Sequence, residues 1–90
     1  MSHPRVVHIA DRRRGAVRVD RATPYGNPFR IGVDGDRAAV IAMYRALLRT
    51  KPALVLKIRT ELKGALLECW CAPEACHADV IAAVADGDDP

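Results

Sequence analysis

The sequence predicts a small α/β domain, in which a three-stranded sheet packs with about three helices in the order β-β-α-α-β-α. Two observations lead to this prediction. Short runs rich in β-branched residues lie near the N-terminus and before residue 71, as expected of strands. Apolar residues elsewhere repeat at the three- and four-residue spacing of helices. Ninety residues suit one domain, so we expect residues 1–90 to fold together, with residues 86–90 as a frayed acidic tail.

Two strands are expected near the N-terminus. Residues 5–10 are rich in β-branched side chains, and residues 16–20 alternate valines with polar residues. The charged turn between them ends in Gly15, so the strands can form a hairpin, although a parallel arrangement also fits. The next segment, 21–35, contains prolines and glycines and is expected to be a loop.

Two helices are expected in the middle of the chain. Asp36 can cap a helix over residues 37–50. Pro52 can start a second helix, and Gly64 stands where a helix C-cap belongs. The apolar residues at helical spacing are Val40, Ile41, Tyr44, Leu47, Leu48, Leu54, Val55, Ile58 and Leu62. These side chains should face the core.

A third strand and a third helix complete the chain. Residues 65–71 form a compact apolar strand, and a helix is expected to start near Pro73 or Glu74. Val80, Ile81 and Val84 would then face inward. In open α/β sheets, ligands bind where such a strand leads into the following helix, so this junction is the expected site.

Composition and charge limit the partners. No apolar run reaches the roughly 20 residues that span a bilayer, and the first residues lack a signal-peptide core. We therefore expect a soluble cytoplasmic protein without a membrane partner. All 14 Lys and Arg lie in residues 1–63, whereas residues 64–90 hold six acidic residues and no Lys or Arg. This asymmetry indicates an anionic partner such as nucleic acid, internal complementarity, or a solvated surface.

The junction concentrates three cysteines and a histidine. Cys69 and Cys71 lie two positions apart on the strand, about 6.8 Å between Cα atoms, and should point to one face. Cys76 and His77 should lie in the first turn of the helix, where the dipole lowers a thiol pKa. Trp70 would point to the opposite face and into the core.

Three interpretations of this cluster remain open. Zinc is the cofactor that the residues suggest, with Cys69, Cys71, Cys76 and His77 as ligands, although the spacing is not the usual C-x2-C. Alternatively, Cys69 or Cys76 is a thiolate nucleophile or redox centre, with His77 as its base. In the third interpretation the cysteines are small buried hydrophobic residues. His8, on the first strand, reaches the cluster if the two strands are neighbours.

A second unusual segment is the loop at residues 23–29. Pro28 holds Asn27 extended, and Gly26 permits a backbone conformation that other residues avoid. The loop is either a tight turn fixed by its aromatic residues or a ligand-facing loop in which Asn27 binds a polar group. Arg30 would then supply an anion contact nearby.

Together these two segments resemble a known family, Domain of Unknown Function 4326, small proteins common in phages and bacteria. The segments are Tyr25-Gly-Asn-Pro-Phe29 and Cys69-Trp-Cys-Ala-Pro-Glu-Ala-Cys-His-Ala-Asp-Val80. The resemblance implies no activity, because the family has none assigned. The hallmark positions that it implies are Tyr25, Gly26, Asn27, Pro28, Phe29, Cys69, Cys71, Pro73, Cys76, His77 and Asp79. Members often have glycine at the position of Ala78.

These observations favour a domain that binds or acts on a nucleotide-like or other anionic small molecule. Its pocket would lie between the loop and the junction, with Cys76 as nucleophile, His77 as proton partner and Asn27 as orienting group. The expected catalytic residues are Cys69, Cys76 and His77, and the expected ligand-binding residues are Tyr25, Gly26, Asn27, Pro28, Phe29, Arg30 and Asp79.

Two alternatives belong to other classes of protein. One is a zinc-stabilised, non-enzymatic phage-type protein that engages a host protein. The other is a nucleic-acid binder that uses the basic N-terminal portion. A homodimer is also compatible with a small sheet that has free edges.

Overall fold

The computed structural model describes residues 3–72 and 74–90 and confirms the predicted class and element order. The strands are β1 (Val6–His8), β2 (Val17–Arg18) and β3 (Leu67–Cys69), and the helices are α1 (Arg37–Arg49), α2 (Pro52–Glu61) and α3 (His77–Ala85). No helix in these residues is long and apolar enough to cross a membrane.

The sheet is entirely parallel, with β3 between β1 and β2. Val6 and Val17 both pair with Leu67, from opposite sides. The two N-terminal strands therefore do not form the hairpin that the sequence left open, because the last strand separates them. Their carboxyl ends lie at the same edge of the sheet as that of β3.

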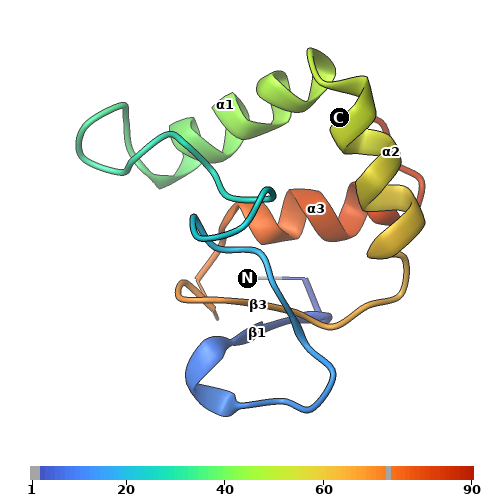
Figure 1. The fold of residues 1–90 in the computed structure, drawn as a ribbon. Coiled ribbons are helices and arrows are strands. Elements are labelled where there is room, and N and C mark those ends of the chain that lie inside the picture. Colours follow the sequence, from blue (N-terminus) through green and yellow to red (C-terminus); the bar gives the residue numbers. More distant parts are fainter. Residues whose placement is uncertain (1–2, 73) are drawn as a thin grey trace.

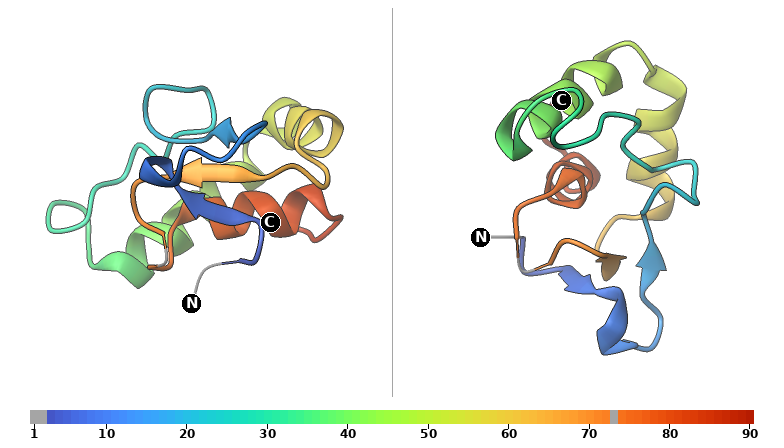
Figure 2. Two further views of the ribbon diagram at one scale, coloured as in Figure 1. Left: turned by 90° about the horizontal axis from the view of Figure 1, so that it is seen from below. Right: turned by 90° about the vertical axis from the view of Figure 1, so that its left-hand side faces the viewer.

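All three helices lie on one side of the sheet (Figures 1 and 2). α3 packs against β1 and β3, and α1 and α2 pack on α3. The core lies between these layers. Its fully buried large side chains include Tyr44, Leu48, Ile58, Leu62, Leu67 and Ile81. The apolar residues at helical spacing therefore face the core as predicted, except that Ile41, Leu47 and Leu54 are only partly buried.

The strands are shorter than predicted. β1 ends at His8 because the chain turns into a 3-10 helix, Ile9–Asp11, and Arg12 adopts a left-handed conformation with a φ of 50°. β2 stops before Val19. α2 ends before its C-cap residue Leu62, so the expected C-cap Gly64 lies in the following turn, with a φ of 71°.

α3 begins later than the sequence suggested. Its first residue is His77, and Cys76 is the N-cap rather than part of the first turn. The Asp79 carboxylate accepts a hydrogen bond from the Cys76 backbone N–H at 3.1 Å, which fixes the helix start at this position. The alternative start at Pro73 lies outside the described residues.

Trp70 was predicted to lie in the core, and this prediction is wrong. Trp70 follows Cys69, the last residue of β3, and it is 59% exposed. The indole N–H donates to the Asp20 carboxylate at 3.1 Å. The ring edge of Trp70 also contacts the His8 ring, with centroids 5.9 Å apart.

The basic first part of the chain and its acidic C-terminal end partly compensate each other within the molecule. Arg5 donates to the Asp86 carboxylate at 2.6 Å and to three backbone oxygens. Arg59 and Arg45 donate to the backbone oxygens of Asp88 and Asp89. Basic side chains from the first two thirds of the chain thus bind its acidic end.

Candidate functional site

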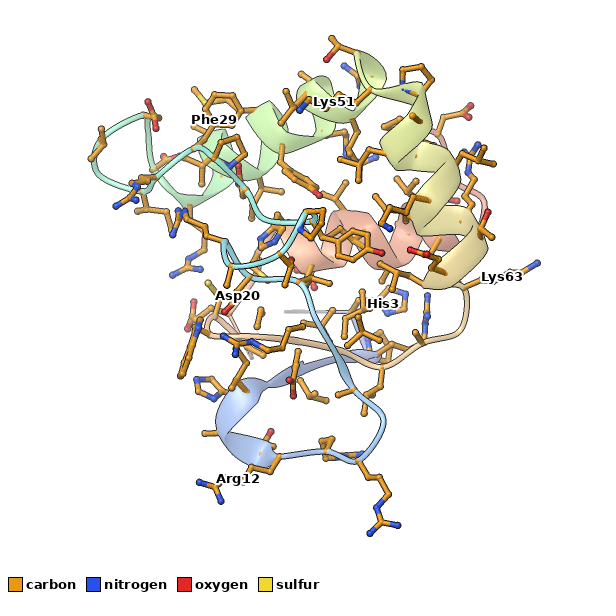
Figure 3. All side chains as sticks on the ribbon, in the orientation of Figure 1. His3, Arg12, Asp20, Phe29, Lys51 and Lys63 are labelled. Atoms are coloured by element: carbon orange, nitrogen blue, oxygen red, sulfur yellow. The ribbon has the colours of Figure 1, made fainter. Side chains whose placement is uncertain are left out.

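A pocket of about 290 Å³ lies at the carboxyl edge of the sheet, between the loop at residues 25–29 and the segment 69–77. Its walls include Asn27, Phe29, Arg37, Cys69, Cys76 and His77. Asp20 and Phe29, both labelled in Figure 3, mark the sheet side and the α1 side of this region. The two segments that stood out in the sequence therefore line one cavity.

Cys69 and Cys76 form a buried thiol pair. β3 ends at Cys69, and the short link to α3 returns Cys76 to it, so that the two Sγ atoms lie 3.1 Å apart. The contact is an S–H···S hydrogen bond in which either sulfur can donate. Both residues are nearly inaccessible, at 2% and 4% exposure, yet both form part of the pocket wall.

The surroundings of the pair favour one thiolate over the other. The hydrogen bond from Cys76, together with the backbone N–H groups of Cys71 and Ala72, lowers the pKa of Cys69 to about 6 despite its burial. The same hydrogen bond and desolvation raise the pKa of Cys76 far above its ordinary value. The sequence suggested Cys76 as the nucleophile, whereas these contacts favour Cys69.

His77 is held in one orientation. Its Nε2 lies 2.6 Å from the Val19 carbonyl oxygen, which can only accept, so Nε2 carries the proton. The ring also packs edge-on against Tyr44, with centroids 5.0 Å apart. Desolvation lowers the pKa of His77, and the ring is therefore neutral at pH 7.

The other ring nitrogen of His77 is not fully buried. Nδ1 has no hydrogen-bond partner among the described residues. Every fully buried side-chain nitrogen or oxygen in those residues has a hydrogen-bond partner, so Nδ1 is not one of the fully buried atoms. Nδ1 therefore has some accessible surface, and because His77 lines the pocket this nitrogen is available to accept a proton.

Cys71 shares the pocket wall but stands apart from the pair. It is partly exposed and free, and within the described part of the chain its sulfur makes no hydrogen bond to the sulfur of Cys69 or Cys76. Within the described residues, no group of three or more His, Cys, Asp or Glu side chains is placed to hold a metal ion. The structure does not gather the four proposed zinc ligands Cys69, Cys71, Cys76 and His77 around a common point.

Asn27 supports the loop from within. Its amide nitrogen donates to the Val40 carbonyl at 3.1 Å, and its oxygen accepts from the Phe29 N–H at 3.0 Å. The side chain is 6% exposed, so the amide that the sequence assigned to a ligand joins the loop to α1. Phe29, the next aromatic residue, forms part of the pocket wall.

Gly26 and Tyr25 fix the other end of the loop. A Cβ atom at Gly26 would lie 2.5 Å from the Arg21 Cα, so only glycine fits without moving backbone. Tyr25 is buried, and its hydroxyl donates to Glu61 at 2.7 Å while its carbonyl accepts from Tyr44. These contacts explain the loop without a ligand.

The remaining predicted residues lie outside the main pocket. Pro28 and Arg30 are exposed and line a second, more open hollow of about 240 Å³. Asp79 caps α3 and accepts from the His3 backbone N–H at 2.7 Å, so both of its oxygens are used. His8, beside Cys69 in the sheet register, contacts Trp70 and does not line the pocket.

Sequence reasoning missed Arg21, Arg37 and Asp20 in the pocket wall. Arg21 donates to the Asn27 and Phe29 carbonyls, and Arg37 donates to the Ala75 carbonyl. Arginines at the start of a loop and of a helix look like ordinary surface residues in a sequence. Only the fold brings them together.

The fold and the site define a class: a small parallel α/β domain with a buried thiol pair and a histidine beside a pocket at the end of its central strand. The chain belongs to the family described as Domain of unknown function (DUF4326), whose model matches residues 6–87. The family resemblance in the sequence is thereby confirmed.

One phage relative supports the same family. The chain is 37% identical over 70 residues to an uncharacterized 12.4 kDa protein in the nrdA-td intergenic region of Enterobacteria phage T4. The match covers 73% of this chain and 63% of that protein, so the chain spans less than two thirds of its relative. No solved structure matches the chain.

Proposed function

We propose that the pocket binds a small anionic molecule of nucleotide type and presents it to the Cys69 thiolate. The observation that carries the proposal is the composition of the pocket: two arginines, aromatic walls and a low-pKa thiol enclose about 290 Å³. That volume is near the lower end of small-molecule sites, roughly 300 Å³, and suits a single nucleotide or a smaller anion. A cytoplasmic location, where thiols stay reduced, suits this chemistry.

The charge in the pocket favours an anion. Arg21 and Arg37 are held by backbone carbonyls, and each guanidinium has further N–H donors. The one carboxylate in the wall, Asp20, is paired with Arg18 and accepts from Trp70. Two fixed cations are thus left to face a ligand, and their rotamer entropy is already lost before binding.

The apolar part of the wall favours a planar ring. Phe29 and Trp70 both line the pocket, together with the aliphatic side chains of Val40 and Ile41. Stacking of a base on an aromatic side chain contributes about 1 to 3 kcal/mol. A ring with an attached phosphate would use both kinds of contact.

The reactive groups lie in the same wall. The Cys69 thiolate would add to an unsaturated carbon of the ligand ring, and the electron pair of the broken π bond would take up a proton from water. The neutral His77 would hold that water by accepting a hydrogen bond at Nδ1. Cys76 stays protonated and stabilises the attacking sulfur through its hydrogen bond.

Calorimetric titration tests the binding step. The reduced protein is titrated with nucleoside monophosphates, the matching nucleosides and inorganic phosphate. We expect a monophosphate to bind and its nucleoside to bind at least about tenfold more weakly, because a charge-assisted hydrogen bond contributes about 1.5 to 3 kcal/mol. Native mass spectrometry of the same sample shows any retained ligand and whether a homodimer forms.

Two arginines on α1 provide matched variants. Arg37→Gln should weaken monophosphate binding about tenfold or more, whereas Arg49→Gln, at an exposed position outside both pockets, should leave it unchanged. Equal affinity for nucleoside and monophosphate, or no binding by any compound in the panel, would contradict the proposal.

Nucleic-acid binding is a second candidate, favoured by three consecutive exposed arginines, Arg12, Arg13 and Arg14, in the turn between β1 and β2. Arg12 projects from the side of the sheet opposite to the helices (Figure 3). Binding to single-stranded DNA that weakens steeply with salt, and that Arg13→Gln reduces, would support it. Salt-independent or undetectable binding would eliminate it.

A further inference from the structure

We propose that Cys69 and Cys76 act as a dithiol that reduces a low-molecular-weight disulfide in the pocket and becomes a disulfide itself. This inference uses the pocket of the proposed function, but it does not depend on anion binding there. It rests on the geometry of the two sulfurs rather than on any one cysteine.

The two sulfurs are already placed for a bond to form between them. They lie 3.1 Å apart, and a disulfide of about 2.05 Å needs an approach of only about 1 Å. Cys69 ends a strand and Cys76 precedes a helix, and residues 70–75 between them form neither helix nor strand where they are described. The approach of the two sulfurs would therefore join the end of β3 to the N-cap of α3.

The two thiols have different roles in the proposed reaction. The Cys69 thiolate attacks one sulfur of the disulfide R–S–S–R, forming a Cys69–S–S–R mixed disulfide and releasing one thiolate, which takes up a proton. The Cys76 thiol then loses its proton to the pocket, where His77 Nδ1 can accept it, and attacks the Cys69 sulfur. The second R–S⁻ leaves, so that the substrate gains two electrons and the Cys69–Cys76 pair loses two.

The surroundings support this order of events. Cys69 receives hydrogen bonds from Cys76 and from two backbone N–H groups, which favour its thiolate, whereas the pKa of Cys76 is raised. A low-pKa attacking thiol beside a protonated resolving thiol is the arrangement that thiol–disulfide exchange requires.

The experiment uses Cys71→Ser protein, which removes the third thiol and leaves the pair. Native protein is mixed with oxidised glutathione or with the smaller, neutral hydroxyethyl disulfide. The reaction is quenched with acid, and the mass of the protein is measured by mass spectrometry. We expect the protein to lose two hydrogen atoms without a lasting adduct. Cleavage after Glu74 separates the cysteines, so the bond is identified as two linked peptides.

Two further variants separate the roles. In Cys71→Ser/Cys76→Ser, a stable mixed disulfide should accumulate on Cys69 to about one per chain. In Cys71→Ser/Cys69→Ser, adduct formation on Cys76 should be at least several-fold slower. Equal rates in both double variants, or faster modification of Cys76, would overturn the assigned roles.

Wild-type and Cys71→Ser protein keep the test decisive if a double variant does not fold. Trp70 is the chain's single tryptophan and is the residue next to Cys69 in the sequence. Its fluorescence can therefore be used to follow disulfide formation in the folded protein. If the disulfide forms no faster in the native protein than in denaturant, the inference fails. Failure of the anion titrations with intact disulfide formation would instead overturn the proposed function alone.

Discussion

The pKa of Cys69 depends strongly on its neighbours. Three donors lower its pKa, and all of them come from the next seven residues of the chain. The sequence could indicate that a reactive thiol lies in this segment. It could not indicate which one, because the helix that was expected to activate Cys76 begins one residue after it.

The rate of Cys69 alkylation should therefore rise through a pH of about 6, rather than near the ordinary thiol value of 9.0. Replacing Cys76 by alanine removes a donor and should move this midpoint upward. The measurement is modification by iodoacetamide in Cys71→Ser protein, followed by mass spectrometry from about pH 5 to about pH 9. An unchanged midpoint in the Cys76→Ala variant would show that the thiol contact does not lower the pKa.

His77 should make the stability of the folded protein depend on pH. Burial lowers the pKa of His77 below its ordinary value of 6.5, so the unfolded chain takes up a proton before the folded protein does. The contribution of His77 to the free energy of unfolding should therefore be lost as the pH drops below about 6.5, and it should be fully retained above that value. His77→Gln can keep the hydrogen bond to Val19 without titrating.

Urea denaturation at about pH 7.5 and about pH 5.5 tests this expectation. The loss of stability between the two should be smaller in His77→Gln than in the wild-type protein. An equal loss in both proteins would assign the effect to other groups, such as the Cys69 thiol, whose pKa is lowered to about 6 in the folded protein.

Among the elements, the loop at residues 25–29 was recognised from its sequence, but its role was not. Prolines, glycine and aromatic residues predicted a rigid turn, and the structure contains one. Whether an amide such as Asn27 faces a ligand or a backbone carbonyl is decided by the position of α1, which lies outside the loop's own sequence. Local patterns predict local conformation, whereas partners across the fold depend on packing.

Gly26→Ala should show how closely this loop controls the pocket. The new methyl group would meet the backbone of Asp20 and Arg21, at a cost of about 1 to 3 kcal/mol in the free energy of unfolding. The loop would have to move with Phe29, so ligand binding should weaken too. Gly15 also has a left-handed backbone conformation, but a Cβ atom there would meet no neighbouring atom. Gly15→Ala is therefore the control, and it should lower stability without changing ligand binding.

For the whole molecule, the class and the order of elements followed from periodicity, but the sheet topology did not. Both short N-terminal runs were consistent with a hairpin, and no residue within them specifies a partner. The exposure of Trp70 was missed for a similar reason, since it depends on what the fold packs against this side chain. The charge asymmetry had several interpretations, and the structure shows one of them, internal complementarity, through Arg5.

Arg5 connects three distant parts of the fold. Its guanidinium donates to the Leu62, Ala65 and Ala82 carbonyls and to the Asp86 carboxylate. Arg5→Lys keeps the charge but cannot make this set of bonds, so we expect a loss of about 1 to 3 kcal/mol in the free energy of unfolding. Arg13→Lys, at an exposed turn position, is the matched control.

Hydrogen exchange would locate the effect of Arg5→Lys. Amide protons near the C-terminal end of α3 should exchange faster in this variant and remain unchanged in Arg13→Lys. Equal stability of the two variants would mean that the contacts of Arg5 add nothing beyond its charge.

The central position of β3 has a consequence for the order in which the protein is made. Synthesis supplies β1 and β2 first, yet neither can form a sheet until Leu67 and the residues after it have been added. A nascent chain that ends before this point carries two strands without a partner. Sheet formation must therefore wait for the segment that also brings Cys69 and Cys76, so the fold and the thiol pair are completed together.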